Sequence, residues 1–245
     1  GKLLASGGGM DADVRVFDAA QKTPLFEVEL AYHAIAALAF SPDGKLLAAG
    51  GWDSRIKLID VAQKTPLRLS AGHEDAVSRV VYSADGRRIY SAGQDHRLIA
   101  WDAATGARLV ERTLPGRAAA LAARPNGELV VVLGGLWKTL FVDGTTLADR
   151  REQEGGEFSA TCRRELLAIT DSARVLLYAG TAPLAPLKTG MLEAWSVAIS
   201  PDGAKLAVGG SPTLQRGGTE LWELQRRRLI TKLLGHEDHV AALHY

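Results

Sequence analysis

The feature that most constrains the fold is a pattern of short apolar runs and tight turns that recurs along the chain. Its most complete copy spans residues 72–102, with the sequence GHEDAVSRVVYSADGRRIYSAGQDHRLIAWD. Short apolar runs separated by turn residues such as Ser-Ala-Asp-Gly and Gly-Gln-Asp predict β-strands joined by tight hairpins. The pattern therefore predicts an all-β fold.

The pattern has a period of about 42 residues, which is typical of a repeat architecture. The segments DAAQKTPLF, from Asp18, and DVAQKTPLR, from Asp60, are nearly identical and lie 42 residues apart. The same period appears in the first-hairpin turns, which end at Gly44, Gly86, Gly127 and Gly203, with a degenerate Arg163-Arg164-Glu165 turn in the fourth place. The whole chain is therefore predicted to consist of similar units.

Residues 72–102 resemble a repeat of the WD-repeat family, in which each unit forms a four-stranded blade of a β-propeller. The resemblance rests on the Gly72-His73 opening, the two turns and the Trp101-Asp102 ending, which occur in that order at the family's spacing. It implies a chain of four-stranded antiparallel blades.

The two ends of the sequence are expected to share one blade. The C-terminal GHEDHVAALHY parallels GHEDAVSRVVY, and the N-terminal GKLLASGG parallels GKLLAAGG from Gly44. We therefore expect a single β-propeller domain over 1–245, with six blades, or seven if the chain is a fragment. Pairing of the N- and C-terminal strands would close the ring and remove its open sheet edges. The expected blades are 236–245 plus 1–30, 33–71, 73–114, 116–155, 156–190 and 191–235.

Composition excludes several classes of protein. A chain of 245 residues with 47% hydrophobic content can bury a sizeable core. Lys plus Arg (29) nearly balances Asp plus Glu (28), so the charge does not indicate a nucleic-acid partner. A single cysteine, Cys162, excludes an internal disulfide framework. No apolar run is long enough to span a membrane. The compartment is left open: the cytoplasm is favoured, and the periplasm is the alternative if a leader precedes this sequence.

His73, Ser91, Asp95 and Trp101 include the residue types of a Ser-His-Asp hydrolase. The family resemblance instead implies a structural tetrad, in which Asp, His, Ser and the Trp indole N–H are hydrogen-bonded in that order within one blade. A buried indole donor needs such a partner. A nucleophilic serine would sit on an exposed sharp turn rather than within a strand. We therefore expect no catalytic residue and no cofactor.

Other blades depart from this tetrad. Ala49 and Ile59 replace the Ser and Trp in the second blade, so apolar packing must hold it together.

The C-terminal cluster of His236, Glu237, Asp238, His239 and His244 lacks the spacing of a His-Glu-x-x-His zinc motif. We expect no metal there.

The residue before each second-hairpin Asp is the best candidate for partner binding. The family resemblance implies that this position rims the central opening, on the face that binds partners. The rim residues here are Met10, Trp52 and Gln94, with added polar contacts from Arg55, His96 and Arg97. Because tryptophan and methionine are enriched at interfaces, we expect a protein or peptide partner on this face.

The leading interpretation is a non-enzymatic platform for protein–protein interaction, either a monomeric propeller or a subunit of a larger complex. One alternative is the propeller domain of a larger bacterial redox or hydrolytic enzyme that binds a small molecule at the channel mouth. No Cys-x-x-Cys-His motif is present, so a haem would have to come from elsewhere. A second alternative is a permuted or engineered propeller. Residues 211–218 extend one hairpin, and we expect a loop there.

Overall fold

The computed structural model describes residues 3–7, 13–18, 21, 23–30, 34–68, 72–156, 158–200, 202–213 and 216–236. The regular elements among these residues are all β-strands, which form one three-stranded and five four-stranded sheets. The strands pair in antiparallel hairpins. This confirms the predicted all-β class. Within the described ranges, no helix is present that could cross a membrane.

The first three sheets follow chain order. The first contains β1 (Leu3–Gly7), β2 (Asp13–Asp18) and β3 (Thr23–Glu29). The second contains β4 (Ile35–Phe40), β5 (Leu46–Gly51), β6 (Ile56–Asp60) and β7 (Thr65–Arg68). The third contains β8 (Val77–Tyr82), β9 (Arg88–Gly93), β10 (Arg97–Asp102) and β11 (Arg108–Thr113).

The other three sheets repeat this order. The fourth contains β12 (Ala118–Ala123), β13 (Glu128–Leu133), β14 (Lys138–Asp143) and β15 (Asp149–Glu154). The fifth contains β16 (Ala160–Arg163), β17 (Leu166–Asp171), β18 (Arg174–Ala179) and β19 (Ala182–Lys188). The sixth contains β20 (Glu193–Ile199), β21 (Lys205–Thr213), β22 (Arg216–Glu223) and β23 (Arg228–His236).

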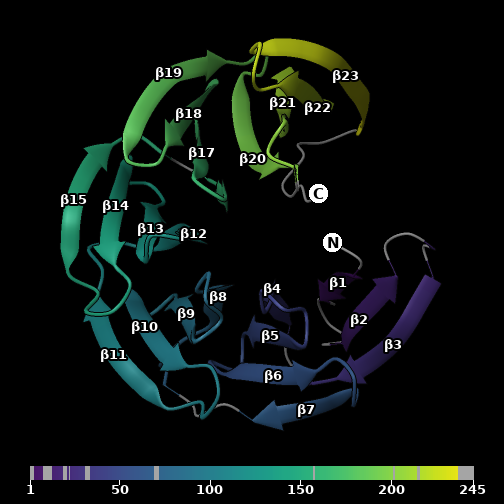
Figure 1. Cartoon of the computed structure of the whole chain (residues 1–245), viewed down its shortest axis with the longest axis vertical. Coiled ribbons are helices and arrows are strands. Elements are labelled where there is room, and N and C mark those ends of the chain that lie inside the picture. Colours follow the sequence, from purple (N-terminus) through teal and green to yellow (C-terminus); the bar gives the residue numbers. More distant parts are fainter. Residues whose placement is uncertain are drawn as a thin grey trace. The chain divides into compact units, whose positions relative to one another are not determined.

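The chain divides into two compact units. The first unit is Gly1–Ala118 with the turn Asp143–Ala148, and the second is Ala119–Val142 with Asp149–Tyr245. In the first unit, Tyr90 stabilises the turn Asp143–Ala148, because its hydroxyl group donates a hydrogen bond to the Gly144 carbonyl at 2.9 Å. The sheets of each unit can be followed by their labels in Figure 1.

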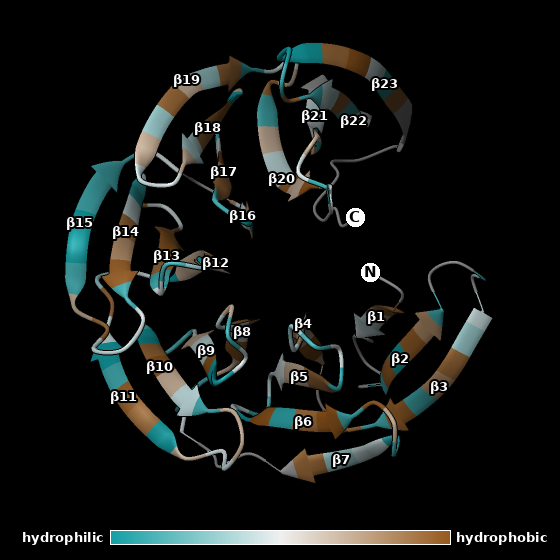
Figure 2. Cartoon of the chain, in the orientation of Figure 1, coloured by the Kyte–Doolittle hydropathy of each residue, from teal (hydrophilic) through white to brown (hydrophobic). Residues whose placement is uncertain are grey.

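Apolar clusters join successive sheets within each unit. In the first unit, one cluster joins the first and second sheets, and another joins the second and third. In the second unit, the corresponding clusters join the fourth to the fifth sheet and the fifth to the sixth. Figure 2 shows the contrast within the fourth sheet, where β13 is hydrophobic and β15 is hydrophilic. Sheets that pack in succession are consistent with a β-propeller.

The predicted ring closure lies outside the described residues, because 237–245 and 1–2 are not among them. The six-blade count and the single-domain assignment stay predictions. The prediction of a loop at 211–218 was wrong in part. Strand β21 continues to Thr213 and β22 begins at Arg216, and these two residues are paired. The second hairpin is therefore extended as paired strands.

A serine–aspartate pair explains the recurrent first-hairpin turn. Ser41 donates its hydroxyl hydrogen to Asp43 at 2.7 Å and accepts the N–H of Leu46 at 2.9 Å. The same contacts recur at Ser83 with Asp85 and at Ser200 with Asp202. In each case the serine hydroxyl is the main cause that lowers the pKa of the aspartate.

In the first-hairpin turn of the fourth sheet, Arg124 replaces the serine. Its buried guanidinium lies 2.7 Å from Oε2 of Glu128, and it also donates to the carbonyl of Gly180, in the turn between β18 and β19. The arginine therefore connects the fourth sheet to the fifth, whereas the serine–aspartate contacts of the other turns lie within their own hairpins.

Candidate functional site

The structure brings His73, Ser91, Asp95 and Trp101 (the tetrad) into one hydrogen-bonded chain in the third sheet. Trp101 on β10 donates its indole N–H to Ser91 Oγ on β9 at 2.8 Å. His73, which precedes β8, places Nε2 2.7 Å from the same Oγ and Nδ1 3.0 Å from Oδ2 of Asp95. Asp95 lies in the turn between β9 and β10 and accepts the backbone N–H of Glu74 at 2.9 Å.

Neutral His73 satisfies every polar atom in this chain. With its proton on Nδ1, the ring donates to Asp95 and accepts the Ser91 hydroxyl hydrogen, while Ser91 accepts from Trp101. Burial lowers the pKa of His73 below 6.5, although Asp95 acts in the opposite direction. Burial alone would raise the pKa of Asp95, but hydrogen bonds from the N–H groups of Glu74 and Arg97 and from His73 lower it below 3.8.

Gly93, at the end of β9, leaves the space that the tetrad occupies. A β-carbon at this position would lie 2.5 Å from Nδ1 of His73 and 2.4 Å from Oδ1 of Asp95. Any side chain there would displace the His–Asp contact. The glycine of the Gly-Gln-Asp turn is therefore required by packing.

The tetrad does not present an exposed nucleophile. Ser91 is 0% exposed, and its hydroxyl oxygen is in hydrogen-bond contact with both Trp101 and His73. A substrate cannot reach this oxygen without unpacking the sheet. The arrangement can fix the position of a turn, but it cannot attack a carbonyl group in this conformation.

The free energy of unfolding should fall as the pH decreases, because the folded protein keeps His73 neutral. The unfolded chain takes up this proton near pH 6.5, whereas the folded chain does so only at lower pH. The contribution is therefore complete above pH ~6.5 and is lost toward the folded pKa, with a slope of at most about 1.4 kcal/mol per pH unit. Urea unfolding at several pH values checks this for the native chain and for His73→Gln, whose slope should be smaller. Equal slopes in the two proteins would contradict it.

The turn between β5 and β6 presents Trp52 to solvent. Its side chain is 63% exposed, while its backbone N–H donates to the carbonyl of Ala34 at 3.0 Å. Asp53 stabilises the same turn: one carboxylate oxygen accepts the N–H of Arg55 at 3.2 Å, and the other lies 2.7 Å from Nζ of Lys57. These contacts therefore fix the backbone of the turn that carries the indole.

The other predicted rim residues differ in how free their side chains are. Arg55 and His96 are exposed, and Gln94 is half-buried with its backbone N–H bonded to Ala76. Arg97 is already engaged, since its guanidinium lies 2.5 Å from Glu74 and 3.2 Å from Glu111. Met10 lies outside the described residues.

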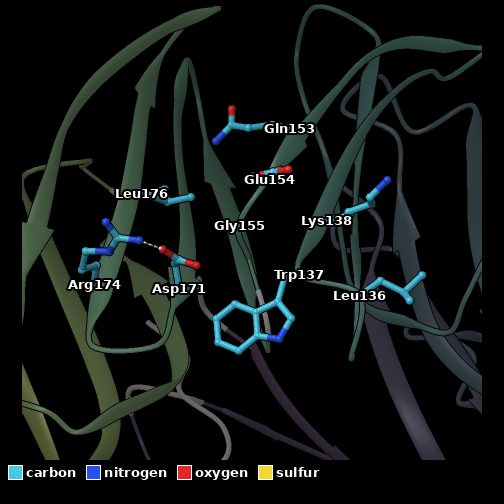
Figure 3. Close-up of a pocket in the computed structure, with 9 residues that line it drawn as sticks. All are labelled: Leu136, Trp137, Lys138, Gln153, Glu154, Gly155, Asp171, Arg174 and Leu176. Carbon is cyan, nitrogen blue, oxygen red and sulfur yellow. Dashed lines mark hydrogen bonds and ion pairs between the residues drawn. The ribbon is translucent and has the colours of Figure 1, made fainter.

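A pocket in the second unit was missed by the sequence reasoning. It has a volume of about 400 Å³ and lies where the β13–β14 turn, the end of β15 and the β17–β18 hairpin meet (Figure 3). The signal was present in Leu136-Trp137, which follows Gly134-Gly135 in the turn equivalent to that of Trp52. In these two turns Trp137 and Ser54 adopt the same left-handed backbone, with φ of 52° and 61°.

The part of the chain that the structure describes contains no candidate metal site and no activated thiol. No group of three or more His, Cys, Asp or Glu side chains there could hold a metal ion. Residues 237–245, which include most of the C-terminal His and acidic cluster, lie outside that part. Burial raises the pKa of Cys162 to about 11, so its thiol is not activated as a nucleophile.

Comparison with known families agrees with the geometry of the third sheet. Residues 26–60 and 64–102 match the family described as WD domain, G-beta repeat, and the tetrad lies in the second of these segments. These two segments are thus WD repeats. No curated protein matches it. WD repeats generally mediate protein–protein interaction, and proteins built from them are usually non-enzymatic scaffolds.

Proposed function

We propose that this chain is a non-enzymatic interaction platform that binds a protein or peptide partner through the surface around Trp52. The observation that carries the proposal is the 63% exposed indole on a turn with a fixed backbone. A tryptophan that is held in place loses little conformational freedom when a partner covers it, so most of its apolar burial contributes to affinity.

The charges of the other predicted rim residues favour a protein partner over a phosphate backbone. Arg55 and His96 are exposed, but Arg97 is neutralised by Glu74 and Glu111. A nucleic-acid surface would instead present several unpaired cations beside aromatic side chains. An aromatic anchor surrounded by charges of both signs is typical of the centre and rim of a protein interface.

The tetrad supports this function indirectly. It ties His73, at the entry to β8, to Asp95, in the β9–β10 turn, so the segments that carry Glu74, Gln94 and His96 are held on one sheet. Fully satisfied polar networks of this kind rigidify the structure that they connect. We infer that the tetrad positions the binding surface and takes no part in chemistry.

Site-specific photo-crosslinking tests the proposal. A photoreactive phenylalanine derivative at position 52 should label a discrete partner in an extract of the source cells. The matched control is position 67, because Leu67 on β7 is 44% exposed and lies in the same sheet. The same labelling at both positions, or none at position 52, would contradict the proposed surface.

A further inference from the structure

The pocket in the second unit is lined by an aromatic ring together with side chains of both charges. Its walls include Trp137, Lys138, Glu154, Asp171, Arg174 and Leu176. In Figure 3 the Trp137 indole extends toward the side on which Asp171 lies, and the ammonium end of Lys138 points away from it. The indole is therefore part of the cavity wall.

Trp137 is held in a costly conformation. Its φ of 52° is uncommon for a bulky side chain, and the ring is 49% exposed. The backbone is fixed because the N–H of Gly155 donates to the carbonyl of Trp137 at 2.7 Å, and the Thr139 hydroxyl donates to the carbonyl of Gly155 at 2.8 Å. Ser54 and His96 have the same left-handed backbone in the equivalent turns, so this conformation belongs to the hairpin and fixes the position of the indole.

Gly155 keeps the cavity open beside the indole. Its φ is 100°, and a β-carbon there would lie 3.3 Å from both Oδ1 of Asp171 and Cδ1 of Leu176. A larger residue would therefore be strained and would fill the space between the turn and the fifth sheet. The glycine leaves room for the apolar stem of a ligand against Leu176.

The carboxylates in and beside the pocket outnumber its cations by one. Lys138 Nζ lies 2.6 Å from Oε1 of Glu152, and Arg174 Nη2 lies 2.5 Å from Oδ2 of the buried Asp171. Both lining cations are thus already neutralised. Exposed Glu154 lies opposite Lys138 in the β14–β15 register, and its charge adds to that of Glu152 in raising the pKa of this lysine. One lysine therefore faces two carboxylates, and the excess charge beside this aromatic-walled cavity is negative.

We propose that this pocket binds a cationic side chain, lysine or arginine, presented by a protein partner. The cation lies against the Trp137 face and pairs with Glu154, while its methylene stem packs on Leu176. A cation over an indole within about 6 Å gains attraction from the ring quadrupole, more so when partly desolvated. An anionic ligand would have to displace Asp171 from Arg174 or Glu152 from Lys138. This site shares no residue with the surface around Trp52.

Fluorine NMR of protein labelled with 5-fluorotryptophan tests the proposal with defined probes. The Trp137 signal, assigned with Trp137→Phe, should shift saturably on addition of n-butylguanidinium or n-butylammonium. The neutral isostere n-butylurea and the anion butyrate should not shift it. The binding should weaken as salt is added, because the pair is partly exposed.

Matched variants identify the carboxylate that pairs with the cation. Glu154→Gln should weaken cation binding by about fivefold or more, a change that corresponds to the loss of one charge pair. Glu193→Gln, which removes an exposed charge on β20, should leave binding unchanged. Trp52→Ala should also leave it unchanged, so failure here is distinct from failure of the proposed function. Equal binding of n-butylurea, binding of butyrate, or an unaffected Glu154→Gln would overturn the proposal.

Discussion

Replacing Glu128 with leucine should lower the free energy of unfolding by about 3–5 kcal/mol, the usual cost of removing one partner from a buried ion pair. Glu128 lies 2.7 Å from the fully buried guanidinium of Arg124 and 3.7 Å from that of Arg151. Arg151 itself stacks 3.6 Å over the ring of Phe141. Without the carboxylate, a buried positive charge loses its counterion. Urea unfolding of the two proteins measures the difference.

The double variant Arg124→Met/Glu128→Leu is the control for this prediction. It removes both charges and keeps comparable side-chain volume, so its stability should recover to within about 1.5 kcal/mol of the native chain. A double variant as unstable as Glu128→Leu would show that the turn geometry, rather than the unpaired charge, carries the effect.

Replacing Ser91 with alanine should lower the free energy of unfolding by about 2–4 kcal/mol, because it leaves two buried polar groups without partners at about 1–3 kcal/mol each. These are the indole N–H of Trp101 and Nε2 of His73, which lie 2.8 Å and 2.7 Å from the serine oxygen. Thermal or urea unfolding gives the value directly.

A double-mutant cycle with Trp101→Phe isolates the hydrogen bond from the packing. Once the indole N–H is gone, Ser91→Ala should cost at least about 1 kcal/mol less than in the native background, since contacting residues couple by about 0.5–3 kcal/mol. Additive losses would mean that the serine hydroxyl does not stabilise the indole.

The sixth sheet satisfies its tryptophan in another way. Trp222 donates its indole N–H to Oε2 of Glu220 at 3.1 Å. The buried Glu220 also accepts the N–H of Gly190 and lies 3.1 Å from Nζ of Lys232. A buried carboxylate thus takes the place of the tetrad serine. The requirement for an acceptor beside the indole is common to both sheets, but the residue that meets it differs.

The strands and the tetrad could be predicted because their determinants are local or repeat at a fixed period. Turns such as Ser-Pro-Asp-Gly recur because a serine and an aspartate two residues later bond within the same hairpin, as Ser41 and Asp43 do. The order of contacts from Asp95 to Trp101 followed from a family pattern with fixed spacing.

The contacts between sheets could not be predicted in this way. Arg124 reaches Gly180 in the next sheet, and the pocket unites Trp137 with Arg174 from separate sheets. No spacing within the sequence predicts these contacts, because they depend on how two sheets pack. The engagement of Arg97 by Glu74 and Glu111 was missed for a similar reason, because the partners lie on different segments.

The affinity of the cross-linked partner for Trp52→Ala tests the interaction surface most directly. Because Trp52 is exposed, the variant should unfold within about 1 °C of the native chain, as surface substitutions away from packed features generally do. Its dissociation constant should rise by about 30-fold or more, which corresponds to a hot-spot loss of about 2 kcal/mol. Leu67→Ala should bind as the native chain does. An unchanged dissociation constant for Trp52→Ala, or earlier unfolding with binding retained, would show that Trp52 serves packing rather than recognition.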